Sequence, residues 1–112
     1  GTDTENRLFQ QITKLLEANH GHISRKELSD ALSYSGTYLN AICKKYSGLS
    51  LFDYGMHFCM KEASIHLLDT DQTIADISRD LGFTNQTHFY KVFKEKYKMT
   101  PMQYRKQNQT KE

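Results

Sequence analysis

The chain has 112 residues, 38% of them hydrophobic and 25% charged, and its formal net charge is +2 at pH 7. This length fits one domain with a single modest core, and the composition is ordinary for a soluble globular protein. No apolar run approaches the ~18 residues that a membrane-spanning helix needs, so the sequence excludes such a helix.

The chain's start and its cysteines lead to expectations about origin and compartment. No basic stretch followed by an apolar one opens the chain, so we expect no signal peptide. Because the first residue is Gly1 rather than Met, we expect a tag remnant or a domain cut from a longer protein. Cys43 and Cys59 are too few for a disulfide framework and are expected to be reduced core residues. A cytoplasmic location is the default expectation.

Helical spacing of apolar residues recurs along the chain, and no alternating run predicts a strand. In the first segment Leu8, Ile12 and Leu16 fall on one helical face, and Gly21 is expected to end that helix. We predict an all-α domain with seven helices, over residues 4–19, 25–32, 36–46, 51–68, 74–81, 85–97 and 101–107.

Capping patterns mark where several of these helices begin. Ser24 and Glu27 form a capping box, because the side chain of each can bond the backbone N–H of the other. Similar patterns start at Ser50, Thr73 and Thr100.

Positive charge gathers in the last quarter of the chain. Residues 85–112 hold seven Lys and Arg against two Asp and Glu, a net charge of +5, whereas residues 69–84 carry −3. A concentrated positive charge suits an anionic partner, although a basic tail can also be only a solubilising surface.

Two segments of the chain resemble each other, residues 27–54 and residues 76–104. Each predicts a short helix, a turn of about four residues and a second helix, which is the helix-turn-helix pattern. One such pattern could be a helical hairpin used only for packing. Two copies joined by a ~27 Å helix over 51–68 favour DNA binding, because that length approaches the ~34 Å between successive major-groove faces.

The second helix of each copy carries polar side chains suited to DNA. Gln can bond adenine through two hydrogen bonds, Lys and His can donate to guanine, and a Thr methyl can contact thymine. The base-edge candidates are Thr37, Asn40, Gln86, Thr87, His88 and Lys91. The candidates for phosphate contacts, which position a protein without reading sequence, are Ser35, Tyr38, Lys44, Lys45, Thr84, Tyr90, Lys94 and Lys96. For each of them, simple solvation at the surface is the alternative.

The stretch IADISRDLGFTNQTHFYKVFKEKYKMTPMQYR, residues 74–105, resembles the signature of the AraC/XylS family of transcriptional regulators. The resemblance extends over about residues 24–106. It implies one DNA-binding domain in which two helix-turn-helix subdomains are joined by a long linking helix. The implied parts are a first helix-turn-helix over about 24–48, a linking helix over about 51–68, a second helix-turn-helix over about 73–97 and a closing helix over about 101–107.

The resemblance also implies partners and contacts. Family patterns place base-edge contacts at Thr37, Asn40 and Ala41 in the first copy, and at Gln86, Thr87, His88 and Lys91 in the second. The implied partner is one extended site on double-stranded DNA, in successive major-groove segments. RNA polymerase is expected as a second partner, and an effector or signal is expected to be handled by another part of the full-length protein.

Four residues depart from the family pattern. Ala41 replaces a long polar residue, which predicts fewer base contacts from the first unit. Gly36 starts the first recognition helix and is expected to weaken it by up to ~1 kcal/mol. Cys59 stands where an arginine is usual, and Lys98 where glycine is typical; a left-handed Lys98 would be strained by roughly 1 kcal/mol.

Other function classes find little support in this sequence. It contains no Gly-rich phosphate loop, nucleophile elbow or paired catalytic carboxylates, so we expect no enzyme, and no metal or cofactor. His20 and His22 could hold a metal weakly, but a solvated loop is the simpler interpretation. The open alternative is a helical protein-interaction module; it would need apolar anchors on 85–97, where the sequence has Gln, Thr, Lys and Glu.

Overall fold

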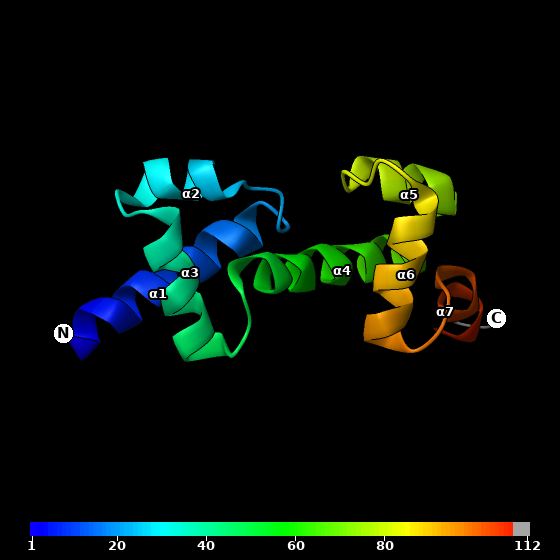
Figure 1. The fold of residues 1–112 in the computed structure, drawn as a ribbon. Coiled ribbons are helices and arrows are strands. Elements are labelled where there is room, and N and C mark those ends of the chain that lie inside the picture. The colour runs from blue at the N-terminus through cyan, green and yellow to red at the C-terminus, as the bar shows by residue number, and fades with distance from the viewer. Residues whose placement is uncertain (109–112) are drawn as a thin grey trace. The chain divides into compact units, whose positions relative to one another are not determined.

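A computed structural model of the chain, which describes residues 1–108, is built from helices (Figure 1). They are α1 (Thr2–Ala18), α2 (Arg25–Leu32), α3 (Gly36–Ser47), α4 (Leu51–Asp69), α5 (Ile74–Asp80), α6 (Gln86–Tyr97) and α7 (Pro101–Asn108). No strand occurs within the described residues. The predicted all-α class and all seven predicted helices are confirmed, with bounds that differ from the predicted ones by at most two residues.

Side-chain caps begin the helices where the sequence predicted them. The Ser24 hydroxyl accepts from the Glu27 N–H at 3.0 Å, and the Glu27 carboxylate accepts from the Ser24 N–H at 2.8 Å. Thr100 and Gln103 form the same reciprocal pair ahead of α7, at 3.1 and 2.9 Å. Single caps of this kind begin α4 and α5. Local sequence therefore sets these helix starts.

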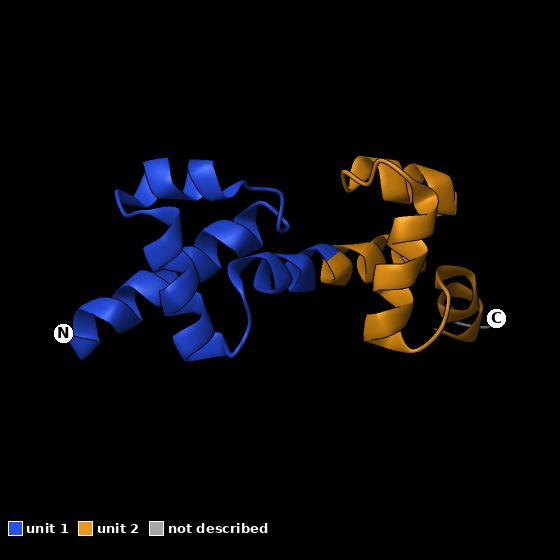
Figure 2. Ribbon diagram, viewed as in Figure 1, with its two compact units in different colours: residues 1–59 blue, residues 60–112 orange. Residues whose placement is uncertain are grey.

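The chain divides into two compact units, residues 1–59 and residues 60–112 (Figure 2). The first unit contains the helix-turn-helix α2–α3, and the second contains the helix-turn-helix α5–α6. The division falls within α4, so this one helix supplies its first half to one unit and its second half to the other.

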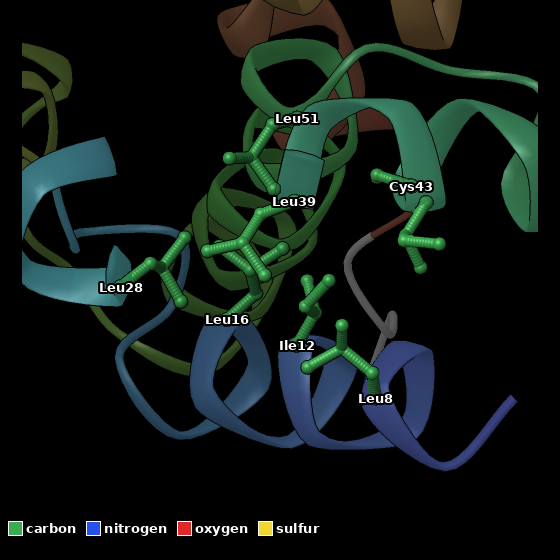
Figure 3. Packing of buried hydrophobic residues seen from close by; sticks show 8 residues of the cluster. Leu8, Ile12, Leu16, Leu28, Leu39, Cys43 and Leu51 are labelled. Carbon is green, nitrogen blue, oxygen red and sulfur yellow. The ribbon is translucent and has the colours of Figure 1, made fainter. Parts of the chain in front are cut away.

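In the first unit, α1 forms a support for α3. Its apolar stripe of Leu8, Ile12 and Leu16 is buried, as predicted. Figure 3 shows this stripe facing the other buried side chains of the cluster, among them Leu28, Leu39, Cys43 and Leu51. Burial of side chains of this size contributes roughly 1.5–3 kcal/mol each. The packing directs one face of α3 inward and leaves the opposite face at the surface.

The connection from α1 to α2 runs against α4 at a glycine. Gly21 has a φ of +78°, the left-handed conformation expected of it, although α1 itself ends at Ala18. A Cβ on Gly21 would lie 2.2 Å from the carbonyl oxygen of Gly55 in α4. Both the backbone conformation and the close approach therefore require glycine at this position.

In the second unit, two phenylalanines of α6 form the centre of the core. Phe89 and Phe93 are fully buried, and Tyr104 of α7 meets Phe93 edge-on with ring centroids 5.3 Å apart. Arg105 fastens α7 to the end of α4 by donating to the carbonyl oxygens of Leu67 and Thr70, at 2.8 and 3.1 Å. The family-signature position of Arg105 therefore has a structural role in this chain.

Candidate nucleic-acid interface

The two recognition helices, α3 and α6, begin in the same way. The Ser35 hydroxyl accepts from the Tyr38 N–H at 3.1 Å, and the Asn85 side chain accepts from the His88 N–H at 2.7 Å. Asn85, which the sequence placed inside the helix, is thus its N-cap. Each cap satisfies a backbone donor of the first helical turn and fixes the direction in which that turn starts.

Four predicted base-edge residues come together on the surface of α6. Gln86, Thr87, His88 and Lys91 are all exposed and lie within its first two turns. The His88 ring meets the Phe83 ring edge-on, with 5.4 Å between the ring centroids. The side-chain amide of Gln86 donates a hydrogen bond to the Tyr90 hydroxyl at 3.4 Å. This surface offers hydrogen-bond donors, an amide and a methyl group, which are the groups that distinguish base edges.

The phosphate candidates of the second unit lie on α6 and in the turn before it. Thr84, Lys94 and Lys96 are exposed, whereas Tyr90 is half-buried. Thr87, Lys91 and Lys94 share one stripe of the helix, because residues spaced three and four apart lie on the same face. The Lys96 ammonium lies over the Tyr97 ring, 5.6 Å from its centroid, and so on a different side of α6.

The exposed face of α3 has fewer polar groups. It carries Thr37, Tyr38, Ala41 and Lys44, all exposed. The Tyr38 ring lies 5.3 Å from that of Tyr34, centroid to centroid, at the start of the helix. Ala41 stands at the position that corresponds to Lys91, which leaves the middle of this face without a hydrogen-bonding side chain.

Asn40, a predicted base-edge residue, has a structural hydrogen bond that the sequence analysis missed. Its side-chain oxygen accepts from the backbone N–H of Leu51, the first residue of α4, at 2.7 Å, and the residue is half-buried. In the second copy the position of Leu51 is occupied by Pro101, which has no N–H to satisfy. Tyr90, which corresponds to Asn40, therefore has no backbone N–H at this position to accept from. Base contact by Asn40 stays a prediction.

Lys45, a predicted phosphate residue, is engaged within the first unit. Its ammonium lies 2.6 Å from the Glu5 carboxylate and ties α3 to α1. The hydrogen bond from Lys45 lowers the pKa of Glu5 below its ordinary value, and the bond to Glu5 raises the pKa of Lys45. A phosphate would have to compete with this carboxylate for the lysine.

The structure also locates the residues that depart from the family pattern. Lys98 ends α6 with a φ of 65° and a ψ of 21°, so it is left-handed, as its replacement of a glycine suggested. Ser33 has a similar conformation after α2. Cys59 is buried. Cys43 is buried as well, and this burial raises the pKa of its thiol.

A family model described as a helix-turn-helix domain, of the AraC type, matches residues 28–107. The chain belongs to the AraC-type helix-turn-helix family. The family resemblance noted in the sequence is thereby confirmed, and the chain is a DNA-binding domain of the kind found in transcriptional regulators.

Individual relatives agree with this assignment. The regulatory protein PocR of Salmonella typhimurium is 34% identical over 101 residues, which cover 87% of this chain and 33% of PocR. The C-terminal domain of the two-component response regulator yesN from Fusobacterium nucleatum is 31% identical, with a TM-score of 0.75, over 86% of this chain and 95% of that domain. An AraC-type transcriptional regulator structure from Chromobacterium violaceum shares the fold, with a TM-score of 0.85 at 23% identity over 94% of this chain and 95% of that one.

This chain spans about a third or less of the first curated relatives that it matches. Within the described residues, none of the helices has both the length and the apolar character needed to cross a bilayer. In the same part of the chain, no group of three or more His, Cys, Asp or Glu side chains is arranged so that it could hold a metal ion.

Proposed function

We propose that this domain binds double-stranded DNA sequence-specifically for a bacterial transcriptional regulator, and that α3 and α6 enter major-groove segments. The observation that carries the proposal is the exposed, capped start of α6, where Gln86, Thr87, His88 and Lys91 lie opposite the buried Phe89 and Phe93. A recognition helix contacts base edges through its N-terminal residues, which is where this polar cluster lies.

Each side chain of the cluster has a chemically defined partner in the groove. Gln86 suits adenine, since its amide can donate to N7 and accept from the N6 amino group through two bonds. His88 and Lys91 can donate to guanine, and the Thr87 methyl can contact thymine. Thr84, Tyr90, Lys94 and Lys96 are proposed to bind the phosphates that flank these bases.

The first unit is proposed to contact DNA with a smaller set of groups. Thr37 and Asn40 are its base-edge candidates, with Asn40 also bonded to the Leu51 N–H, and Tyr38 and Lys44 are its candidates for phosphates. Ser35 caps α3, so a phosphate contact would add to its internal role, whereas Lys45 pairs with Glu5, so a phosphate would compete with that carboxylate.

We further propose that both units bind one extended site. The support is α4, one helix of 19 residues that belongs to both units. Its length of about 28 Å approaches the ~34 Å between successive major-groove segments on one side of the duplex. The single functional domain that we propose therefore comprises residues 1–112.

The remaining parts of the proposal concern the whole protein. Because the chain spans about a third or less of its first curated relatives, an effector or a signal is proposed to act on another part of the full-length protein. RNA polymerase is proposed as a further partner, in the cytoplasm. The domain is proposed to work by binding alone, without catalysis, cofactor or metal.

Selection of bound duplexes from a random DNA library tests the proposal. We expect recovery of a motif with two blocks of preferred bases, their centres about one helical turn, or ~10 base pairs, apart. Binding of no duplex even at low salt would contradict it and would favour a protein-interaction module. Low salt is the sensitive condition, because released counterions drive the binding of phosphate-contacting proteins.

A further inference from the structure

The first recognition helix lacks a side chain where the second has its strongest candidate for base recognition. Gln86 is the first residue of α6, and the corresponding first residue of α3 is Gly36. We infer that Arg25, from the neighbouring helix α2, takes over this position and contacts a base in the groove bound by the first unit. The inference rests on the proposed DNA binding and names a specificity residue that the sequence analysis did not find.

The packing of Arg25 on Gly36 carries this inference. A Cβ on Gly36 would lie 2.4 Å from both Cγ and Cδ of Arg25, and 3.4 Å from its Nε. Atoms do not approach this closely, so the methylene stem of Arg25 fills the space in which a side chain at position 36 would start. The guanidinium therefore begins beside the first turn of α3. Gly36, which the sequence suggested was only a weakness in the helix, provides room for this arginine.

The backbone on both sides of this contact is held in place. Arg25 follows Ser24, whose reciprocal bonds with Glu27 fix the start of α2. The Ser29 hydroxyl donates to the carbonyl oxygen of Tyr34 at 2.6 Å and so joins α2 to the turn before α3. A preorganised stem loses less conformational entropy when the guanidinium binds.

Charge also distinguishes Arg25 from Lys26 and Lys45, two of the other cations of the first unit. Lys26 pairs with Asp30 at 3.0 Å, and Lys45 pairs with Glu5. Arg25 is exposed, and no carboxylate within residues 1–108 forms an ion pair with it. Arginine contacts guanine O6 and N7 through two parallel hydrogen bonds, the commonest specific contact in protein–DNA complexes. We therefore expect a guanine in the block bound by the first unit.

The test uses the purified domain and the duplex recovered by selection. Dissociation constants are measured for duplexes with each base pair of the first block replaced, at several salt concentrations. We expect Arg25→Ala to reduce discrimination at one G·C pair by roughly 5- to 100-fold and to leave the other positions nearly unchanged. Arg25→Lys should restore little of this discrimination, because an ammonium lacks the planar fork of a guanidinium.

Gly36→Ala provides an independent variant that leaves the arginine in the sequence. Its Cβ displaces the Arg25 stem, so we expect loss of discrimination at the same base pair. Alanine favours a helix more than glycine does, so unfolding should not cause the loss, and circular dichroism checks this. The double variant should lose no more than Arg25→Ala alone, because both changes remove one contact.

Lys26→Ala is the matched control, since it removes one charge from the next residue of α2 and should leave base discrimination unchanged. An Arg25→Ala variant that weakens all duplexes equally and lowers the salt slope would overturn the inference in favour of a phosphate contact. An Arg25→Ala variant with unchanged affinity and discrimination would also overturn it. Failure of the unmodified domain to bind any duplex would instead reject the proposed function on which the inference rests.

Discussion

Gln86 and Lys94 lie on the same helix, at its first and its third turn, and both are exposed. Their chemistry differs. An amide has a fixed donor and acceptor that match one base edge, whereas a lysine ammonium is a point charge on a flexible stem that suits any phosphate. The two residues should therefore affect DNA binding in measurably different ways.

Substitution of each residue by alanine tests this difference. We expect Gln86→Ala to relax the preference at one or two base pairs, at a cost of ~1–3 kcal/mol for the preferred site. Lys94→Ala should weaken binding to every sequence and reduce the slope of log K against log salt by about 0.9. Fluorescence anisotropy on matched and mismatched duplexes at several salt concentrations measures both. Equal losses on all duplexes from both variants would contradict the assignment.

The sequence identified a candidate residue more easily when the residues that it contacts lie close to it along the chain. The exposed cluster on α6 was predictable, because the spacing of Phe89 and Phe93 defines the buried face and leaves the polar residues outside. Asn40 and Lys45 were harder, since they bond Leu51 and Glu5, which are 11 and 40 residues away in the chain. The role of Arg25 depends on contact with a glycine of another helix, which no periodicity reveals.

At the scale of single elements, Asn40 connects α3 to the start of α4. We expect Asn40→Ala to lower the free energy of unfolding by about 1–2 kcal/mol, because alanine has no side-chain oxygen to accept the hydrogen bond from the Leu51 N–H. Asn40→Asp retains an acceptor oxygen and should lose less. Urea denaturation measures both variants, with exposed Thr37→Ala as the control. An unchanged stability of Asn40→Ala would show that this hydrogen bond contributes nothing to the fold.

The ion pair between Glu5 and Lys45 joins α1 to α3 and makes the stability of the first unit depend on pH. Because the folded-state pKa of Glu5 is lowered, the unfolded chain takes up this proton more readily. The contribution of Glu5 is therefore present above its unfolded-state pKa and is lost as the pH falls through the lowered pKa. The pKa of Lys45 is raised, so its contribution is lost only as the pH rises through that raised value.

Comparison of the unmodified chain with Glu5→Gln tests this pH dependence. We expect the stability difference to be small, as for other exposed pairs, largest near neutral pH, and to shrink as the solution becomes acidic. Urea denaturation across this range measures it, and Glu17→Gln on the same helix is the control. A difference that stays constant or grows towards acid pH would contradict the role assigned to this pair.

Helix starts were easier to predict than helix ends. Ser24, Thr73 and Thr100 bond backbone groups only three residues away, so the short sequence pattern contains both partners. The observed ends of α1, α3, α4, α5 and α7 each differ by one residue from the predicted ends. The physical difference is that a side-chain cap marks the start of a helix with a particular residue type, whereas the bonds that end these helices join backbone groups, which every residue type carries.

At the scale of the whole molecule, the internal repeat determines the fold. Both copies carry a capped recognition helix with a buried face, and the two caps, Ser35 and Asn85, correspond to each other at an offset of 50 residues. The chemistry of the exposed faces is not repeated: Gln86 and Lys91 correspond to Gly36 and Ala41. The repeat therefore predicted the scaffold well, and it predicted the contacts of the first unit less well.

Binding to a duplex with altered spacing tests most directly whether both units bind one site together. About five base pairs, half a helical turn, are inserted between the two blocks of the selected site, and the affinity is compared with that for the original duplex and for a single block. We predict that the insertion lowers affinity about tenfold or more, towards the value for one block, because the units can no longer bind on the same side of the duplex. Full affinity for the duplex with the insertion would contradict the proposal that both units bind one site together.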